Sequence, residues 1–180
     1  MFKFIAKRKL KSIANKKIKN KHAFLDWNNI RTVLVLFETS EYEAIDTFAE
    51  RLEQAGKTVS GYGFRVKDDN FDYSETNYKI IAPKKDIDKL GVPNNEILNR
   101  LNAENYDVVL DLTIKENIPL EFVLASVNAT MRVGLKKNKL PLYDISISNL
   151  PKANKPESTS AVEELIKSMM YYLQTIKGHT

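Results

Sequence analysis

The residues best suited to chemistry follow the apolar run DVVLDL, in the second half of the 180-residue chain. Asp111 and Glu116 could act as paired carboxylates, and Asp111 with Thr113 could hold a sugar hydroxyl. The alternative is a structural role, because an aspartate at a strand end commonly accepts hydrogen bonds from the loop that follows it. Asn117 would then cap a helix whose first turn contains Pro119. The sequence leaves both interpretations open.

A second candidate site follows the apolar run TVLVLF, where Thr39 and Ser40 lead into a helix. The unbonded N–H groups of a helix N-terminus can hold an anion. Here, however, Ser40 and Glu43 match a capping box, and the carboxylates of Glu38 and Glu41 would repel a phosphate. Capping is therefore the favoured role. Thr39 and Ser40 remain ligand candidates because both follow a strand end, where α/β sheets bind ligands.

Composition and spacing exclude several common kinds of site. The chain has no cysteine and only two histidines, one near each end, so a zinc site would lack ligands. Its six glycines match neither a Walker loop nor a dinucleotide fingerprint, and no G-x-S-x-G elbow is present. We therefore expect no metal, no nucleotide or other cofactor, and no α/β-hydrolase chemistry.

The elements that position these residues alternate between β-branched runs and helical periodicity. This alternation predicts an α/β fold, a three-layer Rossmann-like sandwich with a mainly parallel sheet, formed by a single domain over residues 22–180. The expected strands are TVLVLF, KTVSGYGFRV, YKIIA, DVVLDL, TMRVG and a weaker run over 143–147. The expected helices run from Ser40 to Gly56, over 95–103, from Pro119 onward and from Ser160 to about Lys177. The polar tract over 67–77 is expected to be an exposed loop.

The segments FLDWNNIRTVLVLF, GYGF, LNAENYDVVLDLT, PLEFVLASVNATMRVG and YDISI, after a basic N-terminal helix, resemble an uncharacterised family of small Bacteroidota α/β proteins. This domain of unknown function implies no activity. Residues 106–134 are also similar to the N-terminal domain of lipopolysaccharide heptosyltransferases, where a strand ending in D-L, a helix and a strand ending in R-x-G recur. In those enzymes a Gly-Asp turn after the first strand supplies the catalytic acid. Because the turn here reads FETSEYE, the resemblance implies a single lobe without that acid.

The net charge of +5 is unevenly distributed along the chain. Residues 1–21 contain nine basic and no acidic residues, which leaves 19 basic and 23 acidic residues in the remainder. Segment 1–21 is therefore predicted to form a basic amphipathic helix attached to a mildly acidic domain. Its narrow apolar stripe is Phe2, Ala6, Leu10, Ile13 and Ala14. The residues predicted to contact an anionic surface are Lys7, Arg8, Lys9, Lys11, Lys16, Lys17 and Lys19.

Three roles fit this helix. Its apolar stripe could dock on the domain itself, leaving the lysines as a solvated face. Its cations could instead contact an anionic membrane surface reversibly, or bind the phosphates of a nucleic acid without reading its sequence. Nucleic acid ranks below lipid because no set of stacking aromatic residues accompanies the basic segment.

No apolar run approaches the roughly 20 residues that cross a bilayer, so we expect no transmembrane segment and a cytoplasmic protein, with peripheral attachment at the inner membrane as a further hypothesis. The sequence assigns no function and favours a non-catalytic binding or accessory module over an enzyme. The alternative is a sugar- or nucleotide-sugar-binding protein or enzyme, related to one heptosyltransferase lobe. Its ligand-binding candidates are Asp111, Thr113, Asn117, Thr39 and Ser40.

Overall fold

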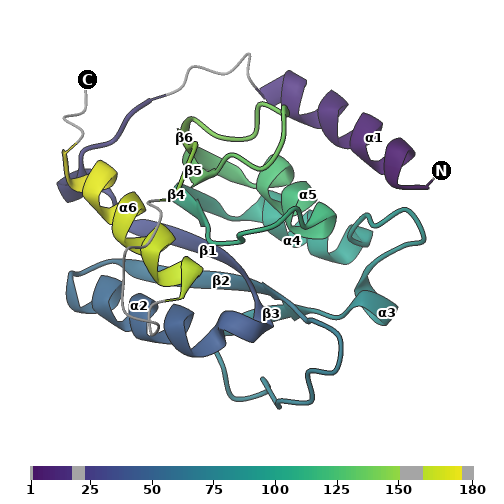
Figure 1. Cartoon of the computed structure of the whole chain (residues 1–180), viewed down its shortest axis with the longest axis horizontal. Helices are drawn as coiled ribbons and strands as arrows, with labels where there is room; N and C mark the ends of the chain where they lie inside the picture. Colours follow the sequence, from purple (N-terminus) through teal and green to yellow (C-terminus); the bar gives the residue numbers. More distant parts are fainter. Residues whose placement is uncertain (1, 18–22, 151–159, 176–180) are drawn as a thin grey trace.

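The centre of the molecule is a six-stranded sheet in the order β3-β2-β1-β4-β5-β6 (Figure 1). The computed structural model describes residues 2–17, 23–150 and 160–175. All neighbouring strands of the sheet pair in parallel. The strands are β1 (Thr32–Glu38), β2 (Thr58–Phe64), β3 (Tyr78–Ile81), β4 (Asn105–Asp111), β5 (Asn128–Leu135) and β6 (Ile145–Ile147).

Helices cover both faces of this sheet (Figure 1). On one face lie α2 (Tyr42–Gln54) and α6 (Ala161–Thr175). On the other lie α4 (Asn95–Ala103) and α5 (Ile118–Ser126), with α1 (Phe2–Lys17) packed against α5. A short helix, α3 (Pro83–Asp86), follows β3. The predicted three-layer Rossmann-like sandwich is confirmed, and its sheet is parallel throughout.

The central strand β1 is buried on both sides. All side chains from Val33 to Phe37 are at most 1% exposed. Because side chains alternate along a strand, Val33, Val35 and Phe37 join the core beneath α2 and α6. Leu34 and Leu36 join the core shared by α1, α4 and α5. The continuous apolar run TVLVLF therefore has the composition of a strand that contacts helices on both faces.

The N-terminal helix α1 is part of this packing. Ala6, Leu10 and Ala14 are at most 3% exposed and join the core on the α5 side of the sheet. The small alanines allow α1 to approach α5 closely. Most of the apolar stripe predicted from the sequence is thus in contact with the protein's own domain.

Two helix starts differ in how they are capped. Ser40 does not cap α2, so the predicted capping box there is wrong: Thr39–Glu41 form a short 3-10 turn (η2), and α2 begins at Tyr42 without a side-chain cap. The chain uses this tight turn to leave β1, which moves the helix start past Ser40. At α6, in contrast, the backbone N–H of Ser160 donates to Glu163 (3.1 Å) and that of Glu163 to Ser160 Oγ (3.2 Å). That capping box is confirmed.

Candidate functional site

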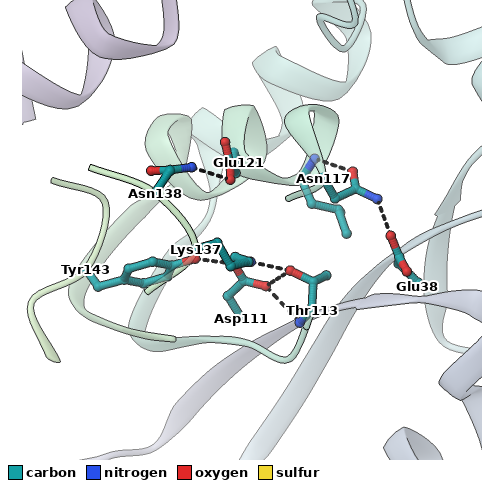
Figure 2. Close-up of polar contacts among 9 residues, drawn as sticks. Glu38, Asp111, Thr113, Asn117, Glu121, Lys137, Asn138 and Tyr143 are labelled. Carbon is teal, nitrogen blue, oxygen red and sulfur yellow. Dashed lines mark hydrogen bonds and ion pairs between the residues drawn. The ribbon is translucent and has the colours of Figure 1, made fainter. Parts of the chain in front are cut away.

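Asp111 is the last residue of β4 and is completely buried. Its Oδ1 accepts hydrogen bonds from the backbone N–H of Thr113 (3.0 Å) and from Thr113 Oγ1 (2.6 Å), as Figure 2 shows. Thr113 is itself only 2% exposed. Half of the carboxylate is therefore satisfied by the loop that follows its own strand, which is the structural role that the sequence allowed.

The other carboxylate oxygen of Asp111 is satisfied by the segment after β5. Lys137 Nζ and the Tyr143 hydroxyl each donate to Oδ2, both at 2.6 Å (Figure 2). Lys137 also donates to Thr113 Oγ1. The Lys137 side chain is only 4% exposed, so the ion pair with Asp111 is shielded from water. We name Asp111, Thr113, Lys137 and Tyr143 the strand-end network.

The groups of this network hold two segments of the chain together. Burial raises the pKa of Tyr143 far above its usual range, and the charge of Asp111 and its hydrogen bond act in the same direction. Tyr143 is therefore a neutral donor at physiological pH. Both oxygens of the carboxylate are occupied, and the charges of Asp111 and Lys137 compensate one another. The network ties the 136–144 segment to the end of β4 through contacts that are largely shielded from water.

Gly134 makes this arrangement sterically feasible. It lies beside Asp111 in the register of β5 with β4. A Cβ atom at Gly134 would overlap the ring of Tyr143. The absence of a side chain lets the ring lie against β5, from where its hydroxyl reaches Asp111.

Glu121 on α5 lies next to the strand-end network and is also completely buried (Figure 2). Its Oε1 accepts a hydrogen bond from Asn138 Nδ2 (2.9 Å), whereas its Oε2 has no partner among the described residues. Burial raises the pKa of Glu121 to about 7, opposed by the charge of Lys137 and reinforced by that of Asp111. A carboxyl group with this pKa is close to half-protonated at neutral pH.

Asn117 lies beside the gap between β1 and β4, where the strand order of the sheet reverses. Its Oδ1 accepts from the backbone N–H of Leu120 (3.2 Å), so the predicted helix cap is confirmed. Its Nδ2 donates to Glu38 Oε1 at the end of β1 (2.9 Å). Ligands of open α/β sheets usually bind at this crevice. Here a hydrogen bond between two side chains of the protein bridges it (Figure 2).

The remaining ligand candidates lie apart from Asp111. Thr39 is 4% exposed and its Oγ1 accepts from the backbone N–H of Val66 (3.1 Å), whereas Ser40 is exposed. Both line a groove of about 820 Å³ between α2 and α6, and the described lining includes neither Asp111 nor Thr113. The structure thus divides the five sequence candidates between separate places. This geometry does not favour a shared sugar site.

Sequence reasoning did not identify Lys137, Tyr143 or Glu121. Lys137 and Tyr143 lie 26 and 32 residues after Asp111, so no local spacing links them. Glu121 had a detectable signal, since it is an acid within the otherwise apolar segment PLEFVLA. A carboxylate in such a segment suggests a buried polar partner.

The solvent-facing side of α1 carries the exposed charges. Arg8, Lys9, Lys11 and Lys16 are exposed, and so are Phe4 (74%) and Ile5 (45%). We name these six residues the outer face of α1. Of the other predicted contacts, Lys7 pairs with Glu116 on the inner side (2.8 Å), the side chain of Lys17 is not described, and Lys19 lies outside the described residues.

Two general findings limit the kinds of site. Among the described residues, no group of three or more His, Cys, Asp or Glu side chains is placed to hold a metal ion. Within the same part of the chain, no helix has both the length and the apolar character to cross a membrane.

Together, the fold and the strand-end network define a Rossmann-like α/β protein with an all-parallel sheet, a docked basic helix and internally satisfied strand-end residues. The chain belongs to DUF6913, a family of unknown function that matches residues 3–176. The expected membership of an uncharacterised family is therefore confirmed. No curated protein and no solved structure shows a significant match.

Proposed function

We propose that this protein is a non-catalytic binding module that attaches peripherally to anionic membrane surfaces through the outer face of α1. The observation that carries this proposal is the composition of that face. Exposed Arg8, Lys9, Lys11 and Lys16 follow two exposed apolar side chains, Phe4 and Ile5, along the same helix. Cations beside exposed aromatic and aliphatic side chains are typical of helices that lie in the membrane interface.

Magnitudes indicate a reversible interaction. Each basic residue near an anionic leaflet contributes about 1 kcal/mol, so these four cations supply about 4 kcal/mol before screening by salt. Burial of Phe4 in the headgroup region adds an apolar contribution of at most about 3 kcal/mol. Ala6 and Leu10 add nothing, since they are already buried against the domain. The helix would therefore lie flat on the membrane while it stays docked on α5.

Vesicle co-sedimentation tests the electrostatic part of this proposal. The full-length chain should bind vesicles of phosphatidylserine and phosphatidylcholine at low salt, and not vesicles of phosphatidylcholine alone. Arg8→Gln with Lys9→Gln should lower the bound fraction severalfold. Lys84→Gln with Lys85→Gln is the matched control, since these lysines are also exposed but lie on α3. Absence of binding by the unaltered chain at low salt would contradict the proposal.

A substitution of Phe4 distinguishes binding to a lipid surface from binding to a nucleic acid. Phe4→Ser keeps all basic residues, so binding to phosphate groups alone should be unchanged. Binding to anionic vesicles should fall, because the apolar contribution is lost. If Phe4→Ser left vesicle binding intact while the chain bound RNA or DNA equally well, nucleic acid would be the better assignment.

The proposed setting is the cytoplasmic side of a bacterial inner membrane. This setting, the Bacteroidota origin and the heptosyltransferase similarity over 106–134 remain predictions from the sequence. No catalytic role is assigned to Asp111 or Thr113, whose polar groups are engaged with Lys137 and Tyr143. The proposal consequently rests on α1 alone.

A further inference from the structure

An acidic groove lies between α2 and the polar segment that leads into β3. It has a volume of about 430 Å³. The carboxylates that line it are Asp46, Glu50, Glu53, Asp72 and Glu75. No basic residue of the described chain lines it. Glu50, Glu53 and Glu75 are exposed and form no ion pair with another described residue. Their charges are therefore available to an outside partner.

An exposed aromatic side chain stands at the rim of this groove. Phe71 is 55% exposed and is an aromatic residue within the tract that the sequence predicts as an exposed polar loop. It packs on Tyr73 and Tyr42, with ring centroids 4.8 and 5.5 Å away. Tyr73 is 7% exposed, and its hydroxyl donates to Asp69 (2.9 Å). Phe71 is thus held in place by the buried Tyr73 and the half-buried Tyr42 while its own ring faces solvent, which suits an apolar contact.

The outer face of α1 is complementary to this groove in charge and in polarity. It presents four cations together with Phe4 and Ile5, and segment 1–21 contains no acid. The two surfaces cannot meet within one chain. α1 is held on the α5 side of the sheet through Leu10 and its neighbours, whereas α2 covers the opposite face (Figure 1).

We propose that the groove between α2 and the 71–78 segment binds the outer face of α1 from a second copy of this chain. Phe4 and Ile5 would contact Phe71, and the cations would face Glu50, Glu53 and Glu75. Such a contact joins two different surfaces, so it is heterologous and can continue from copy to copy. Single ion pairs at a protein surface contribute only about 0.2–1 kcal/mol each, and salt screens them. The association is therefore weak, reversible and salt-dependent.

This inference adds self-association to the membrane function, because both use the same face of α1. A chain bound to a vesicle would have its outer face occupied and could offer only its groove. Anionic vesicles should consequently shorten chains of copies in solution. Groove substitutions should abolish self-association without lowering vesicle binding, which separates the two proposals experimentally.

Sedimentation velocity of the full-length chain tests the inference. At low salt the sedimentation coefficient should rise with protein concentration. In about 1 M salt, where the Debye length is about 3 Å, it should be constant at the monomer value. Glu50→Lys with Glu53→Lys should give a monomer at low salt, and its binding to anionic vesicles should not fall, because α1 is unchanged and the added charges are positive. Asp72→Lys with Glu75→Lys provides a second groove variant on a different segment, should the first perturb α2.

A mixing experiment distinguishes this contact from general charge attraction. The groove variant Glu50→Lys with Glu53→Lys keeps an intact α1, and the variant Phe4→Ser with Arg8→Gln and Lys9→Gln keeps an intact groove. Each alone should be monomeric, and the mixture should form a 1:1 dimer that grows no further. The inference is overturned if the unaltered chain stays monomeric at low salt, if both groove variants associate like it, or if the mixture stays monomeric.

Discussion

Lys137 Nζ lies 2.6 Å from Asp111 Oδ2, and the two side chains are 4% and 0% exposed. An ion pair so deeply buried stabilises the protein only while both partners are present. We expect Lys137→Met to lower the free energy of unfolding by about 3–5 kcal/mol at neutral pH, since it leaves the Asp111 carboxylate charged and uncompensated. Urea denaturation measures this change.

The control for this variant is Lys136→Met. Lys136 is exposed and adjacent in sequence, so its loss should change the free energy of unfolding by less than about 0.5 kcal/mol. In the background of Asp111→Asn, the effect of Lys137→Met should shrink or reverse, because the buried Lys137 charge has already lost its partner there and its removal relieves that cost. Equal effects of Lys137→Met in both backgrounds would show that the ion pair does not exist in solution.

Glu121 should make stability depend on pH in a defined window. Its folded-state pKa of about 7 lies above the pKa of 4.5 of an unperturbed glutamate. The folded state therefore binds the proton more tightly than the unfolded state. The contribution of Glu121 is fully present below the unfolded pKa, is lost as the pH rises through the folded pKa, and is constant above it. The difference across this window is about 3 kcal/mol.

Glu121→Gln isolates this contribution from other titrating groups. As the pH rises from about 4.5 to about 8, the free energy of unfolding of the variant should increase by about 3 kcal/mol relative to that of the unaltered chain. Gln keeps an acceptor for Asn138, so the hydrogen bond at Oε1 can persist. Urea denaturation of both chains across this range is the measurement. Parallel stability curves for the two chains would disprove a raised pKa at Glu121.

Gly134→Ala should destabilise the protein through a steric clash with Tyr143. The added Cβ overlaps the tyrosine ring, and overpacking of this kind costs about 1–3 kcal/mol. Thermal unfolding monitored by circular dichroism reports the loss. In the background of Tyr143→Ala the same substitution should be nearly neutral, because the ring is gone. If Gly134→Ala still destabilised the protein in that background, the cause would be the backbone of β5 and not the clash with Tyr143.

Asn117→Ala should lower the free energy of unfolding by about 1–2 kcal/mol, because it removes the cap of α5 and the hydrogen bond to Glu38. Ser40→Ala is the matched comparison, since the sequence pattern places a cap there and the structure shows none. Its effect should stay within about 0.5 kcal/mol. Chemical denaturation of the two variants measures both effects. If Ser40→Ala lowered the free energy of unfolding as much as Asn117→Ala, α2 would begin at Ser40 and not at Tyr42.

Local signals explain why so much of the fold was predictable. TVLVLF and DVVLDL are apolar without alternation, and both are central strands buried on two faces. Asn117 and Ser160 each cap a helix within three residues, so a short window contains the whole interaction. The Ser40 prediction failed because a capping pattern does not reveal that the chain first makes a 3-10 turn as it leaves β1.

The sequence by itself determined the parallel α/β architecture, the family and the concentration of positive charge in residues 1–21, since each depends on composition or on neighbours along the chain. The tertiary structure decided the role of Asp111, because Lys137 and Tyr143 reach it only when β4 and β5 pair. It also decided that the apolar stripe of α1 packs on the protein's own domain, one of the roles that the sequence left open. Leu10 docks on the domain, and this contact turns Phe4 outward with the cations. Contacts between distant segments depend on how the layers pack, and no spacing along the chain encodes them.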